Sequence, residues 1–132
     1  MVSPIPNRHV LVVDDIDDVR TSVRMLLELE GHTVREARDG ESALKALLTG
    51  EFDIALIDLG LPGMDGHELA RRIRHTDIGA RISLVAVSGQ GTDKHYDEAI
   101  DAGFDEFMPK PPDMGVLGSW VNELPRRHAQ NK

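Results

Sequence analysis

Cysteine is absent from this chain of 132 residues, and basic residues are outnumbered by acidic ones. The lack of cysteine excludes disulfide bonds, thiolate metal sites and thiol catalysis. The chain has 15 Lys and Arg residues against 23 Asp and Glu residues, which gives a formal net charge of -8. Nucleic-acid binding needs clustered basic residues that neutralise phosphates, so this charge argues against a direct nucleic-acid partner. A basic partner or Mg²⁺ suits the chain better.

Long apolar segments are missing as well. No stretch approaches the roughly 20 residues of a membrane-spanning helix, and the N-terminus lacks the charged start and apolar block of a signal peptide. We therefore expect a cytoplasmic protein. The Gly-x-x-x-x-Gly-Lys-Ser/Thr pattern of P-loop nucleotide-binding proteins does not occur in the sequence either.

The chain length and the hydrophobic content of 40% fit a single compact domain. We expect a disordered lead-in over residues 1–7, because this segment contains Pro4 and Pro6. The domain itself is expected to span residues 8–124. Residues 125–132 begin with a proline and are predicted to form a flexible tail.

Five strand patterns alternate with five amphipathic helical patterns along the chain. Strands are expected at 9–13, 33–36, 54–57, 82–87 and 105–108, and helices begin near residues 16, 39, 65, 92 and 113. The helix that begins near residue 92 has few large apolar anchors. The six histidines and the three arginines at 71, 72 and 74 are interpreted as surface residues. The predicted inward faces of the second and last helices are Ala43, Leu44, Leu47 and Leu48, and Val116, Leu117, Trp120 and Val121.

This alternation predicts an α/β fold, in which five parallel strands form one doubly wound sheet with helices on both faces. The strand patterns at 9–13, 54–57 and 82–87 are apolar, whereas 33–36 is polar and 105–108 runs into proline. Central strands are buried on both faces, so the polar strands belong at the edges. The strand order 2-1-3-4-5 of flavodoxin-like folds meets this requirement.

Polar side chains stand where four of the strands end, and they form a candidate site. They are Asp14 and Asp15, then Asp58, then Ser88, and finally Lys110. The carboxyl ends of parallel strands lie at one edge of the sheet, where ligands bind. Three neighbouring carboxylates repel one another unless a cation is close. Mg²⁺ prefers oxygen ligands, and Mg²⁺ together with Lys110 would neutralise an incoming phosphoryl group and make Asp58 a plausible nucleophile.

Five short motifs follow one another along the chain. Each is a weak signal alone, but their order and separations are highly specific. With them the chain resembles a response-regulator receiver domain of two-component signalling, from about Arg8 to Leu124. The motifs are Val12-Val13-Asp14-Asp15, Asp58-Leu-Gly-Leu-Pro-Gly-Met-Asp-Gly66, Val87-Ser88-Gly89, Ala102-Gly103-Phe104-Asp105 and Lys110-Pro111.

The resemblance implies a phosphoacceptor switch in a phosphorelay rather than a conventional enzyme. It implies that Asp58 accepts a phosphoryl group from a histidine kinase or a histidine phosphotransfer protein. Mg²⁺ would be bound by Asp15, Asp58 and the backbone carbonyl of Gly60, while Asp14 would act mostly through water. Lys110 would pair with the phosphoryl group.

The resemblance also implies how the signal is passed on. Ser88 would hydrogen-bond the phosphoryl group, and Phe107 matches the aromatic switch residue that moves inward when the serine is recruited. The Lys110-Pro111 peptide bond is expected to be cis. Phosphorylation would shift a pre-existing equilibrium toward a different partner-binding face around the helix that begins near residue 92.

Several alternatives stay open at this point. Asp15-Ile16-Asp17 after an apolar strand resembles the opening of haloacid-dehalogenase-type phosphatases, but Asp58 would then have no role. A degenerate receiver would bind partners without being phosphorylated. The motif wording is similar to receiver modules of hybrid kinases, so the chain is either such a module or a stand-alone receiver. Gly60 and Gln90 occupy variable positions that influence the lifetime of the phosphoryl group.

Overall fold

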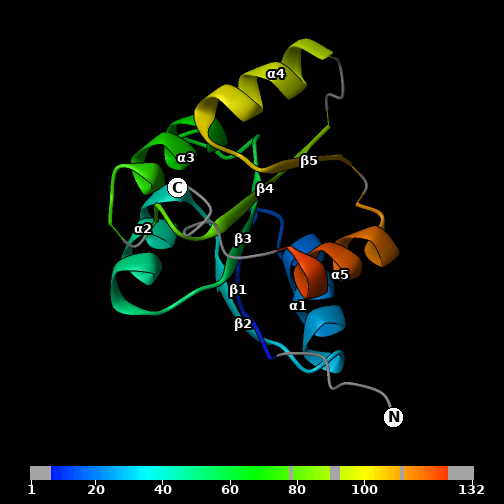
Figure 1. The fold of residues 1–132 in the computed structure, drawn as a ribbon. Coiled ribbons are helices and arrows are strands. Elements are labelled where there is room, and N and C mark those ends of the chain that lie inside the picture. Colours follow the sequence, from blue (N-terminus) through cyan, green and yellow to red (C-terminus); the bar gives the residue numbers. More distant parts are fainter. Residues whose placement is uncertain (1–6, 78, 90–92, 111, 125–132) are drawn as a thin grey trace.

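The computed structural model describes residues 7–77, 79–89, 93–110 and 112–124. Most of the expected lead-in and all of the expected tail lie outside these residues. Strands and helices alternate along the described chain (Figure 1). The strands are β1 (His9–Val13), β2 (Thr33–Ala37), β3 (Ile54–Asp58), β4 (Ser83–Ser88) and β5 (Glu106–Pro109). The helices are α1 (Asp17–Leu29), α2 (Gly40–Thr49), α3 (Gly66–Arg74), α4 (Asp93–Ala102) and α5 (Met114–Glu123).

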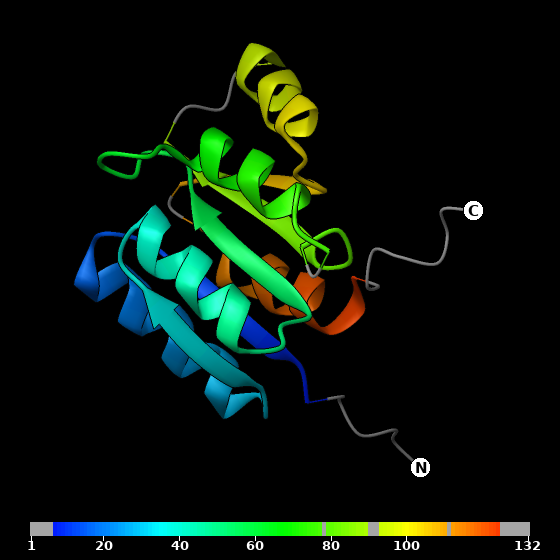
Figure 2. The same cartoon turned by 90° about the vertical axis from the view of Figure 1, so that its left-hand side faces the viewer.

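The five strands form one sheet in the order β2-β1-β3-β4-β5, and every pair of neighbours is parallel. The predicted fold class and strand order are therefore confirmed. Helices α1 and α5 cover one face of the sheet, and α2, α3 and α4 lie on the other side (Figure 1 and Figure 2). The apolar strands β1, β3 and β4 are central because both of their faces are covered.

Strand β1 shows how one short segment holds both helix layers. Its side chains alternate between the two faces, as in any strand. Val10 and Val12 belong to the core beneath α1 and α5, whereas Leu11 and Val13 belong to the core beneath α2, α3 and α4. All four are buried. Each buried aliphatic side chain stabilises the fold by about 1.5–3 kcal/mol, so both layers are fixed to this strand.

Aspartates cap the first turn of three helices, where backbone N–H groups have no partner within the helix. Asp39 accepts a hydrogen bond from the Ser42 N–H at 2.8 Å. Asp65 accepts one from the Glu68 N–H at 2.9 Å and so starts α3 directly after the turn that follows β3. This turn contains Gly63, whose φ of 76° favours glycine. Asp113 caps α5 in the same way.

In each of two predicted helix faces, one residue was wrongly expected to face inward. Leu48 was expected to face inward but is 65% exposed, and Val116 is 40% exposed. The buried positions are taken by Ala46 in α2 and Gly118 in α5. A helix has 3.6 residues per turn, so its buried face is narrow, and the packing of the helix against the sheet decides which apolar residues lie on that face.

Two residues that were predicted to lie on the surface are buried or largely buried. The His32 side chain is only 4% exposed; one ring nitrogen accepts a hydrogen bond from the Arg8 N–H, and the other lies 2.7 Å from Asn122 Oδ1. The Arg74 side chain is 13% exposed and pairs with Asp105 at 2.9 Å. Both predictions failed because the partners are distant in the sequence.

Among the described residues, no helix has the length and apolar character that crossing a membrane requires.

Candidate functional site

The ends of four strands bring the predicted site residues to one edge of the sheet. Asp14 directly follows β1, and its N–H continues the sheet pairing by donating to the Ala37 carbonyl at 3.1 Å. Asp58 is the last residue of β3, and Ser88 is the last residue of β4. Lys110 directly follows β5, and its N–H donates to the Ser88 carbonyl at 2.7 Å. The predicted convergence of these residues is therefore observed.

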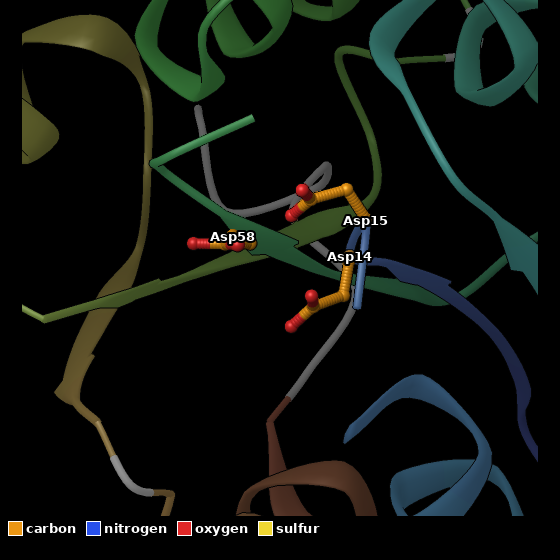
Figure 3. A group of neighbouring side chains, drawn as sticks. All are labelled: Asp14, Asp15 and Asp58. Carbon is orange, nitrogen blue, oxygen red and sulfur yellow. The ribbon is translucent and has the colours of Figure 1, made fainter. Parts of the chain in front are cut away.

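Three carboxylates form the centre of the site (Figure 3). One carboxylate oxygen from each of Asp14, Asp15 and Asp58 lies within 4.8 Å of the others. Asp14 is 4% exposed and Asp58 is 5% exposed, whereas Asp15 is exposed. The group therefore combines two buried acids with one that is exposed to solvent.

Among the described residues, Lys110 pairs with the carboxylates of both buried acids. Its Nζ lies 3.0 Å from Asp58 Oδ2 and 3.7 Å from Asp14 Oδ2. The other oxygen of Asp58, Oδ1, accepts a hydrogen bond from the Gly60 N–H at 3.0 Å. Both oxygens of Asp58 are therefore engaged, one by a cation and one by the backbone of the turn after β3.

The negative charge of the three acids exceeds the positive charge that Lys110 supplies. Burial raises the pKa of Asp14, and the charges of Asp58 and Asp15 raise it further. The Ile16 N–H, which donates to Asp14 Oδ1 at 2.8 Å, and Lys110 act in the opposite direction without cancelling the rise. Asp14 therefore holds its proton more tightly than a solvated aspartate does, and a further cation beside it would be bound favourably.

Partial burial alone would lower the pKa of Lys110. The hydrogen bond and charge of Asp58, with the charges of Asp14 and Asp15, outweigh burial, so the pKa of Lys110 is raised. The lysine is thus held in its charged form next to the carboxylate that ends β3. A charged lysine there can neutralise an anion that approaches Asp58.

Two further predicted residues lie on the β4 and β5 side of the site. Ser88 is buried, and its strand register places it beside Pro109. Phe107 is half-buried, and its ring meets the Tyr96 ring edge to face, with centroids 6.1 Å apart and planes at 72°. The aromatic pair links β5 to α4. Gln90 and Pro111 lie outside the described residues, and so does the expected cis Lys110-Pro111 bond.

One contact at the site was not anticipated from the sequence. Arg20, in α1, donates a hydrogen bond from Nη1 to the backbone carbonyl of Asp14 at 2.7 Å. The sequence shows only an arginine five residues after an acidic pair, and a helical arginine is usually interpreted as a solvated charge. Its partner Glu36, at the end of β2, is brought close only by the pairing of β1 with β2.

Residues 10–122 match the sequence family described as the response regulator receiver domain. The chain belongs to this family. The family prediction is therefore confirmed: the chain is a receiver domain of a two-component system, a phosphoacceptor rather than a classical enzyme. The acidic triad is typical of the receiver metal site and is consistent with a phospho-aspartate site. The phosphatase alternative does not hold, and a kinase partner is implied.

Curated relatives match most of this chain but extend well beyond it. The chain is 32% identical over 117 residues to the transcriptional regulatory protein AfsQ1 of Streptomyces coelicolor, covering 89% of this chain and 51% of that protein. It is 33% identical over 119 residues to the CAI-1 autoinducer sensor kinase/phosphatase CqsS of Vibrio cholerae, covering 86% of this chain and 17% of that protein. The chain thus spans about half of the length of the first relative and about one sixth of the length of the second.

Solved structures share the fold over nearly the whole chain. The receiver domain of the Francisella response regulator 1452 superposes with a TM-score of 0.83 at 28% identity, covering 88% of this chain and 94% of that one. A response regulator receiver protein from Pseudomonas putida superposes with a TM-score of 0.82 at 29% identity, covering 89% of this chain and 97% of that one. Each of these solved chains is therefore matched over almost its whole length, and each covers nearly nine-tenths of this chain.

Proposed function

We propose that Asp58 accepts a phosphoryl group from a histidine of a kinase or of a histidine phosphotransfer protein. The observation that carries this proposal is that Lys110 reaches Asp58 at 3.0 Å within a cluster of three carboxylates. Among the three acids, Asp58 has the shortest contact with the lysine and ends a central strand. These features favour Asp58 as the acceptor over Asp14 and Asp15.

The donor set fits Mg²⁺. We propose that Asp15, Asp58 and the backbone carbonyl of Gly60 hold the ion, with Asp14 acting mostly through water. Hard carboxylate and carbonyl oxygens are the ligands that Mg²⁺ prefers. Burial, and then the charges of Asp58 and Asp15, raise the pKa of Asp14, so a cation that offsets these charges would be bound favourably. When bound, Mg²⁺ would offset the carboxylate charges and polarise a phosphoryl oxygen.

The proposed transfer needs little from the protein beyond position and charge. A carboxylate oxygen of Asp58 forms a bond to phosphorus while the phosphorus–nitrogen bond of the donor breaks, and the donor imidazole leaves with the bonding electron pair. Lys110 is placed to move from Asp58 to the incoming phosphoryl oxygens, because its side chain already spans Asp58 and Asp14. Ser88 would donate a hydrogen bond to another of these oxygens.

We propose that the phosphorylated state changes the surface around α4. Ser88 would move toward the phosphoryl group, and Phe107 would follow it inward. The contact between Phe107 and Tyr96 supports this route, because a shift of Phe107 must change the packing of α4. In the part of α4 whose side chains are described, only Ala99 and Ala102 are buried, so little packing resists such a movement.

The downstream effect of a receiver domain depends on the domains or partner proteins that it contacts. Relatives named as transcriptional regulators and as a sensor kinase are about twice as long as the matched region or longer. We propose that this receiver acts in the cytoplasm through protein contacts or by passing the phosphoryl group on, either alone or as part of a larger regulator. We propose no direct contact with nucleic acid, because the net charge is -8.

Intact-protein mass spectrometry after incubation with acetyl phosphate and Mg²⁺ tests the acceptor. The parent should gain one phosphoryl group, and Asp58→Asn should gain none. Asp53→Asn is the matched control, because Asp53 is also buried and directly precedes the same strand at its opposite end. This control should be phosphorylated like the parent. Phosphotransfer profiling against the histidine kinases of the source organism would then identify the donor.

Two outcomes would overturn the proposal. Phosphorylation of Asp58→Asn to the extent of the parent would assign the chemistry to another residue. A parent that accepts no phosphoryl group from acetyl phosphate or from any kinase would be a degenerate receiver. Mg²⁺ is tested separately: it should raise the melting temperature of the parent by mass action, and Asp15→Ala should lose most of this rise.

A further inference from the structure

Arg20 connects the acidic site to the rest of α1 and to the end of β2. Its Nη1 donates to the carbonyl oxygen of Asp14 at 2.7 Å, its Nε donates to Glu36 Oε1 at 2.7 Å, and its Nη2 donates to Asp17 Oδ1 at 2.6 Å. The side chain is only 13% exposed. A planar guanidinium that donates to three acceptors on three sides is held in one orientation.

The carbonyl that Arg20 holds belongs to the peptide bond between Asp14 and Asp15. A peptide unit is planar, so the position of its oxygen also restricts the Cα atoms of the residues on both sides. The other polar groups of Asp14 are held as well: its N–H by the Ala37 carbonyl, and its side chain by the Ile16 N–H. Together with these contacts, Arg20 restricts the backbone that carries the carboxylates of Asp14 and Asp15.

We propose that Arg20 is a positioning residue for the metal site, which fixes the direction of the Asp14 and Asp15 carboxylates through the backbone between them. This inference rests on the proposed function, because it assumes that these carboxylates bind Mg²⁺. In this role Arg20 contacts Asp14 through the backbone carbonyl and not through the carboxylate. Outer contacts that orient metal ligands typically change metal affinity by 10–100-fold when they are removed.

Arg20 could affect Mg²⁺ binding either through its positive charge or by holding the carboxylates in position. These two roles predict opposite changes in Mg²⁺ affinity when Arg20 is removed. If Arg20 acted only as a positive charge near the site, its removal would reduce repulsion of the cation and Mg²⁺ would bind more tightly. If Arg20 holds the carboxylates in place, its removal lets the loop relax and Mg²⁺ binds more weakly. The sign of the change in affinity therefore separates the two roles.

Arg24 provides a matched control on the same helix. Its Nε lies 2.5 Å from Glu36 Oε2, so it shares the acceptor residue of Arg20, and its Nη1 pairs with Glu28 at 3.2 Å. No described contact joins Arg24 to the carbonyl of Asp14. Arg24→Gln removes the same charge and disturbs the same glutamate while leaving the Asp14 contact in place.

The experiment is a calorimetric titration of the parent, Arg20→Gln, Arg20→Lys and Arg24→Gln with Mg²⁺ alone. We expect Arg20→Gln to bind Mg²⁺ at least tenfold more weakly than the parent, and Arg24→Gln to bind it equally or more tightly. Arg20→Lys keeps the charge but lacks the planar guanidinium that donates to three acceptors, so it should also bind Mg²⁺ more weakly. Phosphorylation by acetyl phosphate should recover in Arg20→Gln at saturating Mg²⁺.

Parent-like or tighter binding in Arg20→Gln would overturn the positioning role, and so would equal losses in Arg20→Gln and Arg24→Gln. If Arg20→Gln does not fold, parent-like affinity in Arg20→Lys would overturn it. The parent titration reports on the proposed function separately. A parent that binds no Mg²⁺ would refute the metal site itself, whereas a parent that binds and an unaffected Arg20→Gln would refute only this inference.

Discussion

Both ends of the parallel sheet contain buried or partly buried acids, but these acids have different partners at the two ends. At the amino end of the strands, Asp53 accepts a hydrogen bond from the His9 N–H at 2.8 Å. Asp105 accepts one from the Leu84 N–H at 2.9 Å and pairs with Arg74. At the carboxyl end, three acids share one lysine.

This difference separates structural acids from a site. Buried polar groups with complete partners stabilise a fold and change little in affinity for an added ion. Acids that outnumber their cationic partners cost stability when no ion is bound, and they are retained where a ligand supplies the missing charge. The amino end of the sheet should therefore govern stability, and the carboxyl end should govern binding.

The largest expected effect is on the amino end, from Arg74→Met. Arg74 pairs with Asp105 and donates to three backbone carbonyls, those of Gly79, Ile82 and Gly103. Its removal leaves a partly buried carboxylate and these carbonyls without their donor, so the free energy of unfolding should fall by about 3 kcal/mol. Urea denaturation measures this loss, and Mg²⁺ affinity of the folded variant should stay within a factor of two or so of the parent.

Arg72→Met is the control for Arg74→Met. Arg72 lies on the same helix and pairs with Glu68 at 2.7 Å, but both of these side chains are exposed. Exposed pairs contribute about 0–1 kcal/mol, so this variant should be close to the parent in stability. Equal losses in the two variants would show that the amino end of the sheet has no special role in stability.

A smaller loss is expected from His32→Phe. The ring of His32 joins the start of β1 to α5, since it accepts from the Arg8 N–H at 3.1 Å and contacts Asn122 at 2.7 Å. Phenylalanine fills the space but leaves both partners unsatisfied, which should lower the free energy of unfolding by about 2 kcal/mol. Adding Asn122→Leu should restore part of this loss, because it removes one unsatisfied group. A double variant that is no more stable than the single variant would contradict the hydrogen-bond explanation.

The fold and the centre of the site could be predicted from the sequence because their signals are local. Apolar runs mark β1, β3 and β4, and parallel pairing then brings the residues that end the strands to one edge without further assumptions. Asp14, Asp58 and Lys110 were therefore predicted to converge, and they do. Ser88 is placed at the same edge for the same reason.

Contacts between distant segments could not be predicted in this way. Arg74 appeared to be one member of a solvated arginine cluster, yet it reaches residues up to 31 positions away. His32 contacts Asn122, which is 90 positions away. Arg20 pairs with Glu36, which is 16 positions away and lies on β2. A single sequence shows which residues are charged or apolar, but side-chain partners depend on the tertiary packing that follows from the complete fold.

The smallest expected effect comes from a substitution at the carboxyl end of the sheet. This substitution should raise the free energy of unfolding, whereas the preceding ones lower it. The pKa of Asp14 is raised above its ordinary value of 3.8, so between the two values the native state holds more protons than the unfolded chain. The free energy of unfolding therefore falls as pH rises through this window, and at neutral pH the full loss is present. Without Mg²⁺, Asp14→Asn should be about 1 kcal/mol more stable than the parent at pH 7, and no more stable below about pH 3.8. Asp15→Asn, with the same charge change at an exposed acid, should gain less. Urea denaturation between pH 3 and 8 tests this, and a gain in Asp14→Asn that is equal at all pH values would show that the cost of ionising Asp14, from burial and then from the neighbouring acids, is not its cause.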